Sequence, residues 1–237
     1  MQAPADTAAP AATRVLVVDD DHARAELIQK WIGEFPDYDW VGHHATRDGL
    51  RGLATRIRPD IVVLDLTLPE DEFSDPDHDC GRRCAEDLRD VAPDARILIV
   101  TTNAAAQGPE VVRTTGAEGL LLDVSIRGAD RVQRFRHALD GVRDGFQQLD
   151  TRASDIAALA ERCGLEPRHV DLLPWLFYAV PSKQIAEKRD YAEKTMETYR
   201  SHVIQRISSG LGKPCSNATE AAVAFYRELG ITPEDPR

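Results

Sequence analysis

The sequence predicts a doubly wound parallel α/β domain followed by an all-α domain. Two observations carry this prediction. Short apolar runs rich in Val, Ile and Leu alternate with helix-sized segments up to residue 122, and only helical periodicity follows residue 128. The length of 237 residues allows two compact domains.

The apolar runs are the predicted strands of the first domain. Their β-branched residues suit strands that are buried on both faces of a parallel sheet. The five predicted strands are Arg14–Asp19, Asp39–Val41, Ile61–Leu66, Arg96–Thr102 and Gly119–Leu122. Segments between them have apolar residues at helical spacing and predict covering helices, among them His22–Ile32, Leu50–Ile57 and Arg83–Val91.

The region after residue 128 predicts a long helix. Apolar residues recur there in a 3-4-3-4-3 spacing, at Val132, Phe135, Leu139, Val142, Phe146 and Leu149. The same spacing continues through Ala153, Ile156, Ala160 and Cys163. We expect the first part to pack on the sheet, and the rest to form either a helical linker or a short coiled-coil seam between protomers.

The last part of the chain predicts a set of short helices. Leu165–Ala179 is the first, although Pro174 is unfavourable inside it. Ser182 is a suitable N-cap for the second, and Gly210 and Gly212 are expected to break the chain after the third. The remaining predicted helices are Lys183–Lys188, Glu193–Ile207 and Asn217–Leu229.

Composition limits the environment of the chain. No run approaches the roughly 18 apolar residues of a membrane span. Residues 1–13 are rich in Ala and Pro and lack the basic start and apolar core of a signal peptide, so we expect a disordered tail there and a cytoplasmic protein. Thiols are reduced in that compartment, and we expect no disulfide framework among Cys80, Cys84, Cys163 and Cys215.

Charge is distributed unevenly along the chain. Residues 151–237 hold 12 Lys and Arg and 12 Asp and Glu, so the net charge of −11 resides in the N-terminal part. Residues 182–213 hold seven basic and four acidic residues. Because nucleic acids attract basic segments, a contact with them is expected in that segment.

Polar residues end three of the predicted strands. Asp19 and Asp20 end the first, Asp65 ends the third, and Thr101 with Thr102 ends the fourth. The carboxyl ends of parallel strands meet at one edge, where ligands bind in this fold class. Clustered carboxylates repel one another unless a cation joins them, and Mg²⁺ suits a site of a few carboxylates and several waters. A carboxylate beside a metal can also act as a nucleophile toward a phosphoryl donor.

These segments resemble the receiver domain of two-component response regulators, the CheY-like family with a flavodoxin-like fold. The resemblance covers residues 14–149 and rests on VLVVDDD at 15–21, PDIVVLDLTLP at 59–69, ILIVTTNA at 97–104 and GAEGLLL at 116–122. It implies that Asp65 is the phospho-acceptor in a phosphorelay, and that Thr101 is the switch hydroxyl. It also implies that Asp19, Asp20 and Asp65 hold Mg²⁺ and that a cognate histidine kinase is a partner.

The sequence departs from the receiver pattern after the last strand. Asp123 stands where the family has a lysine that pairs with the phosphoryl oxygens, and Leu120 replaces the switch aromatic. A carboxylate at that position would repel a phosphoryl group. Weak, short-lived or absent phosphorylation is therefore an alternative.

The second departure is an acidic insertion at residues 70–80. The family reaches a glycine sooner after the acceptor, whereas Gly81 lies 16 residues after Asp65. We interpret the insertion as a solvated acidic loop, because its spacing matches no established zinc pattern. A metal or redox sensor is the alternative, and its ligands would come from Asp75, Asp77, His78, Asp79, Cys80 and Cys84.

Residues 165–237 carry a second resemblance, to the LuxR-type helix-turn-helix of the NarL/FixJ group. It rests on LEPR at 165–168, SKQIA at 182–186, KTMETYRS at 194–201 and TEA at 219–221. On a helix, Met196, Val203 and Ile207 share an inward face. The resemblance implies that the helix at Glu193–Ile207 enters the major groove of DNA.

The second resemblance also implies which residues contact DNA. The base-reading candidates are Glu197, Thr198 and Ser201, and the phosphate and neighbouring contacts are Lys183, Lys194, Thr195, Tyr199 and Arg200. Arg189 replaces a leucine of the family, and Tyr191 is the expected substitute for the lost apolar contact. Modules of this kind bind paired half-sites, so we expect a homodimer.

The sequence as a whole predicts a DNA-binding response regulator that controls transcription and is gated by its receiver, in the usual scheme through phosphorylation of Asp65. Its expected parts are a tail (1–13), a receiver (14–149), a helical linker (150–164) and a helix-turn-helix domain (165–237). One alternative is a regulator whose receiver serves dimerisation or ligand and redox sensing without phosphorylation. Another is a protein-interaction module without DNA binding. We expect no enzyme, because the chain has no Gly-rich phosphate loop, nucleophile elbow or paired metal-histidine motif.

Overall fold

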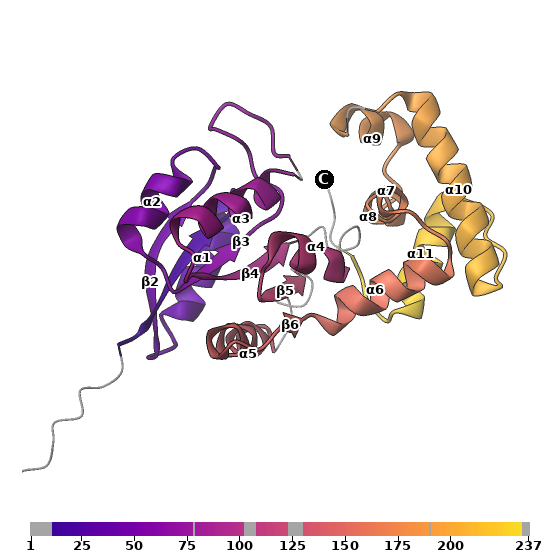
Figure 1. The fold of residues 1–237 in the computed structure, drawn as a ribbon. Coiled ribbons are helices and arrows are strands. Elements are labelled where there is room, and N and C mark those ends of the chain that lie inside the picture. The colour runs from indigo at the N-terminus through magenta and orange to yellow at the C-terminus, as the bar shows by residue number, and fades with distance from the viewer. Residues whose placement is uncertain (1–10, 78, 102–107, 123–129, 190, 234–237) are drawn as a thin grey trace, which may run out of the picture.

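The computed structural model describes residues 11–77, 79–101, 108–122, 130–189 and 191–233. Its N-terminal part contains a parallel sheet of six strands in the order β2-β1-β3-β4-β5-β6 (Figure 1). The strands are β1 (Thr13–Val18), β2 (Tyr38–His44), β3 (Ile61–Leu64), β4 (Arg96–Thr101), β5 (Gly119–Leu122) and β6 (Gln148–Leu149). This order confirms the doubly wound class and brings the carboxyl ends of β1, β3 and β4 together.

Helices cover both faces of the sheet. On one face lie α1 (His22–Ile32) and α5 (Arg131–Asp144), whose Ile28 and Phe135 share an apolar cluster with Val15 of β1. On the other face lie α2 (Leu50–Ile57), α3 (Cys80–Val91) and α4 (Gly108–Thr115). The central strands are therefore buried on both sides, as their continuous apolar runs indicate.

The long helix predicted after residue 128 ends earlier than its spacing indicates. α5 stops at Asp144, and Gly145, with a φ of 82°, caps it in the left-handed conformation. The chain then forms β6, which pairs with β5 through Leu149 and Leu120. Phe146 is 66% exposed. The prediction of one continuous helix is wrong. The apolar spacing continues through the turn, and Gly145 is the feature of the sequence that indicates it.

The next helix, α6 (Thr151–Arg162), packs against α4 and β5. Its apolar face belongs to a cluster that also contains Val112 of α4 and Val203 of α10 (Glu193–Leu211) in the C-terminal part. The buried residues of that face are Ala153, Ile156, Leu159 and Ala160, with Cys163 directly after the helix. Because this face is covered within one chain, it does not form a seam between protomers in this arrangement.

The C-terminal part consists of short helices around α10. They are α7 (Pro167–Val170), α8 (Leu173–Phe177), α9 (Ser182–Lys188), α10 (Glu193–Leu211) and α11 (Ala218–Glu228). The single helix predicted at 165–179 is thus two helices. Pro174 lies at the start of α8, where its missing N–H group costs little.

Two local predictions about these helices also need correction. Ser182 is the first residue of α9 rather than its cap, which is Pro181. Gly210 lies inside α10, and a Cβ atom there would be only 2.6 Å from the Cα atom of Cys163. Gly210 thus permits the close approach of α6 to α10, and Gly212, with a φ of 62°, ends the helix.

Within the described ranges, no helix combines the length and the apolar character needed to cross a bilayer.

Candidate functional site

The polar groups predicted at the sheet edge lie together there. Asp19 directly follows β1, Asp65 directly follows β3, and Thr101 is the last residue of β4; all three are buried. Ligand atoms of Asp19, Asp20 and Asp65 lie within 4.8 Å of one another. The sheet therefore brings three carboxylates into one small pocket.

A residue that sequence reasoning missed enters this pocket from α1. Arg24 is only 8% exposed, and its guanidinium contacts both buried carboxylates. Its Nε atom donates to Asp19 Oδ2 at 2.5 Å, and its Nη2 atom donates to Asp19 Oδ1 at 2.8 Å and to Asp65 Oδ2. Arg24 thus bridges the first-strand and third-strand carboxylates.

Backbone N–H groups add one further hydrogen bond to each of these two carboxylates. Thr67 N donates to Asp65 Oδ1 at 3.2 Å, and Asp21 N donates to Asp19 Oδ1 at 2.8 Å. All four carboxylate oxygens of Asp19 and Asp65 therefore accept a hydrogen bond from a protein donor.

The pocket shifts the protonation of its carboxyl groups. The pKa of Asp65 is raised to about 6, mainly by burial; the charge of Arg24 opposes this shift, and the charge of Asp19 contributes to it. Burial, followed by the charge of Asp19, also raises the pKa of Asp20. The carboxylates are thus crowded, and the positive charge of Arg24 stabilises the ionised form of Asp65.

The donor set has the right chemistry for Mg²⁺, because carboxylate oxygens are its usual protein ligands. The arrangement does not fit the ion, however, since Arg24 already holds both oxygens of Asp19 and one oxygen of Asp65. A divalent ion would have to displace the guanidinium.

The predicted switch region is only partly described. Thr101 is fully buried at the end of β4, and Leu120 is buried in β5. Asp123 and Thr102 lie outside the described residues. The expectation about Asp123 therefore stays a prediction.

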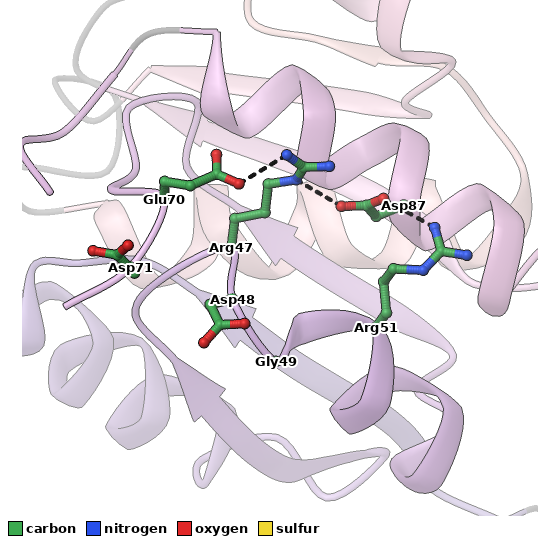
Figure 2. Close-up of a pocket in the computed structure, with 7 residues that line it drawn as sticks. All are labelled: Arg47, Asp48, Gly49, Arg51, Glu70, Asp71 and Asp87. Atoms are coloured by element: carbon green, nitrogen blue, oxygen red, sulfur yellow. Dashed lines mark hydrogen bonds and ion pairs between the residues drawn. The ribbon is translucent and has the colours of Figure 1, made fainter. Parts of the chain in front are cut away.

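The base of the acidic insertion is fastened by ion pairs to the segment before α2 and to α3. A pocket of about 370 Å³ lies there, lined by Arg47, Asp48, Gly49, Arg51, Glu70, Asp71 and Asp87. Figure 2 shows Arg47 between Glu70 and Asp87, to which it donates at 2.9 and 2.7 Å, while Arg51 also reaches Asp87. Both arginines are already paired with carboxylates. We therefore interpret these ion pairs as a network that stabilises the fold and not as a ligand-binding site.

The two thiols beside the insertion are buried. Cys80 and Cys84 have no exposed surface, and burial raises the pKa of both thiols. They are protonated at neutral pH and so poor nucleophiles. In the part of the chain that the structure describes, the insertion's acids and thiols form no metal-binding group. His78 lies outside that part.

The predicted helix-turn-helix consists of α9 and α10. Met196, Val203 and Ile207 are fully buried, which confirms the predicted inward face of α10. The opposite face near the start of α10 is exposed, and it carries Lys194, Glu197, Thr198 and Ser201. Lys183 is exposed on α9, while Thr195, Tyr199 and Arg200 are partly buried.

Tyr199 is held in place by its neighbours. Its ring packs edge-on against His169, at 5.5 Å between centroids, and against Tyr191, at 5.7 Å. The guanidinium of Arg168 lies 5.3 Å from the centre of the Tyr199 ring. Tyr199 therefore connects α10 to α7. The phosphate contact predicted for Tyr199 is a separate role.

Arg189 has a partner of opposite charge that the sequence did not reveal. Burial raises the pKa of Asp171 to about 6, and the nearby charge of Arg189 opposes this shift. Arg189 ends α9, so the charge pair connects α9 to the segment between α7 and α8. A charge interaction with Asp171 thus stands at the position where an apolar contact was expected.

Comparisons with known proteins agree with this architecture. No protein-family model matches the chain. The chain is 28% identical over 225 residues to the DNA-binding transcriptional activator DevR/DosR of Mycobacterium tuberculosis, a match that covers 91% of this chain and 94% of the relative. It is 23% identical over 220 residues to the nitrate/nitrite response regulator NarL of Escherichia coli K12, covering 90% and 95% of the two chains.

A solved structure extends the similarity to the fold of both parts. The two-component response regulator RcsB, in a complex with DNA, has a TM-score of 0.53 and 18% identity, and the match covers 92% of this chain and 98% of RcsB. At that identity the likeness concerns the fold alone. In its sequence relatives and in its fold, the chain is therefore similar to two-component response regulators of the NarL type.

Proposed function

We propose that the chain is a sequence-specific DNA-binding regulator of transcription, gated by its receiver, rather than an enzyme. Residues 14–149 would be the receiver, 150–164 the linker and 165–237 the DNA-binding domain. The observation that carries the proposal is the exposed polar face at the start of α10, set on a fully buried apolar face. DevR/DosR and RcsB, named as DNA-binding proteins, support it.

The proposed contacts follow from exposure along α9 and α10. Glu197, Thr198 and Ser201 are exposed on successive turns and would read base edges in the major groove. Phosphate contacts would come from Lys183, Lys194 and Arg200, with Thr195 and Tyr199 at the rim of the interface. Because the C-terminal part carries no net charge, we propose that a homodimer on paired half-sites provides the affinity.

The proposed compartment follows from the proposed ligand. A regulator that reads DNA works where the chromosome is, so we propose the cytoplasm as its location.

The gate has two candidate modes. In the usual mode, a histidine kinase would phosphorylate Asp65, and Thr101 would respond at the end of β4. In the second mode, the receiver works without phosphorylation. The bridge from Arg24 to Asp65 favours the second mode, because the guanidinium holds an oxygen that would have to attack the phosphorus.

A selection from a pool of random duplexes, with the full-length protein, tests DNA binding. We expect one enriched sequence of paired half-sites, whose affinity falls steeply as salt rises because phosphate contacts release counterions. Lys194→Ala should weaken binding to all sequences alike and reduce the salt slope by about 1. Glu197→Ala should cost about 1–3 kcal/mol and relax the preference at one base pair.

The matched control is Gln205→Ala, an exposed position on α10 beyond the proposed contact turns. It should leave both affinity and preference unchanged. If no duplex is enriched and no duplex binds in a salt-dependent manner, the chain is not a DNA-binding protein. A protein-interaction module would then be the better assignment.

A further inference from the structure

We infer that Arg24 is the resident cation of the acidic pocket: it takes the place that a divalent metal would occupy and shields Asp65 from phosphorylation. The inference deepens the proposed function, because it assigns the receiver a metal-independent and phosphate-independent mode. Its tests use metal binding and phosphoryl transfer and involve no DNA. Its failure can therefore be told apart from failure of the proposed DNA binding.

The local fold of α1 directs Arg24 into the pocket. The side chain of Asp21 caps α1 by accepting hydrogen bonds from the N–H groups of Ala23 and Arg24, at 2.9 and 3.2 Å. This cap fixes the first turn of the helix at the sheet edge. Arg24 lies on the same helix face as Ile28 and Trp31, so its side chain points inward with them.

The burial of Arg24 indicates a fitted position. A guanidinium removed from water is strongly destabilising unless charges and hydrogen bonds compensate for the lost hydration. Arg24 is 8% exposed, and its two carboxylate partners are 2% and 4% exposed. The fork-shaped contact of Nε and Nη2 with both oxygens of Asp19 is the geometry that makes arginine specific for carboxylates.

The same contacts oppose both reactions expected of a receiver. A divalent ion needs carboxylate oxygens that face it, and the guanidinium of Arg24 already bonds both oxygens of Asp19 and one oxygen of Asp65. Attack on phosphorus uses a lone pair on an Asp65 oxygen, and Arg24 and Thr67 N each engage one lone pair of that carboxylate by hydrogen bonding. One arginine therefore balances the charge of the pocket and restrains its nucleophile.

Thermal unfolding of the full-length protein, in EDTA and in excess magnesium chloride, tests the cation assignment. The wild type should unfold at the same temperature in both. Arg24→Met should unfold at a lower temperature in EDTA and regain several degrees with magnesium, about what a site filled well above its Kd provides. Adding Asp65→Asn to Arg24→Met should abolish the magnesium response.

The control Arg134→Met removes an exposed arginine from α5 and should behave like the wild type. A magnesium response of the wild type as large as that of Arg24→Met would overturn the inference. If Arg24→Met does not fold, direct titration of the wild type with Mg²⁺ by calorimetry decides: no binding heat supports the inference, and a saturable site overturns it.

Intact mass after incubation with magnesium and a small phosphodonor tests the shielding. We expect no phosphoryl adduct on the wild type under conditions that label an ordinary receiver run in parallel. One adduct on the wild type that is lost in Asp65→Asn would overturn the shielding, and would identify phosphorylation as the working mode of the gate.

Discussion

The side chain of Asp150 accepts a hydrogen bond from the backbone N–H of Leu122 at 3.0 Å, and so ties the end of β5 to the start of α6. Its other oxygen accepts from the N–H of Arg152 at 2.9 Å and caps α6. Asp150 is 8% exposed. One buried carboxylate thus fixes the angle at which α6 leaves the sheet.

Asp150→Ala should destabilise the protein by about 2 kcal/mol, because the helix loses its cap and a buried N–H group loses its acceptor. Urea unfolding measures the change. Asp155→Ala, an exposed position on the same helix, is the control and should change stability by less than about 0.5 kcal/mol. Equal effects of the two variants would show that the junction does not depend on Asp150.

Gly81 allows α3 to begin against the segment that contains Asp65. A Cβ atom at Gly81 would lie 2.3 Å from the Cα atom of Leu66 and 2.6 Å from the carbonyl oxygen of Asp65. Gly81→Ala should therefore shift α3 and cost about 1–3 kcal/mol. Gly52→Ala is the matched control in α2, where nothing lies within 4 Å, and it should stabilise the helix by up to about 1 kcal/mol. Chemical denaturation of both variants would show opposite signs.

Stability should depend on pH through Asp65. The pKa of its carboxyl is about 6 in the folded chain and near 3.8 in the unfolded chain, so the folded chain binds more protons between these values. Stability from this group is therefore lost as pH rises from about 4 to 6, by about 2–3 kcal/mol. Asp65→Asn should remove this loss. The measurement is the difference in unfolding free energy between wild type and variant at pH 4, 5, 6 and 7; a constant difference would contradict the prediction.

We expect the effects of substituting Asp171 and Arg189 on stability to depend on each other. Arg189→Leu leaves a largely buried carboxylate without its countercharge and should cost about 1–3 kcal/mol at neutral pH. Adding Asp171→Asn should recover most of the loss, because no buried charge remains. Thermal unfolding of the two single variants and the double variant measures the coupling. Additive effects would show that the two residues do not interact.

The strands and the acidic edge could be predicted because their signals are local. β3 and the last four residues of β1 are unbroken apolar runs, and the residue that follows each run is the carboxylate found at the sheet edge. The inward face of α10 followed from its spacing in the same way. These features need only the period of the structure and the known direction of parallel strands.

Arg24 could not be assigned to the pocket in this way, because its partners lie five and 41 residues away. The signal was present as an arginine on the apolar face of a helix, four residues before Ile28. An inward arginine indicates a buried acid but does not say which one. Similarly, Arg189 looked like a defect until the fold brought Asp171 beside it.

The turn at Gly145 shows a different limit. The apolar spacing runs through it, so periodicity alone favoured one helix. In the structure, α5 ends because Gly145 adopts the left-handed conformation and the chain after it pairs with β5 as the two-residue strand β6. Short strands of this kind have too few residues to leave a pattern.

The shared packing of α6 has a consequence for the history of the chain. Ile156 and Leu159 belong to a core that residues of the N-terminal and C-terminal parts form together. Gly210 must also stay small for Cys163 to approach α10. A hybrid joined at either end of α6 would expose apolar surface on one side of the junction. Substitutions in the two halves are therefore expected to be inherited as matched sets rather than exchanged by recombination.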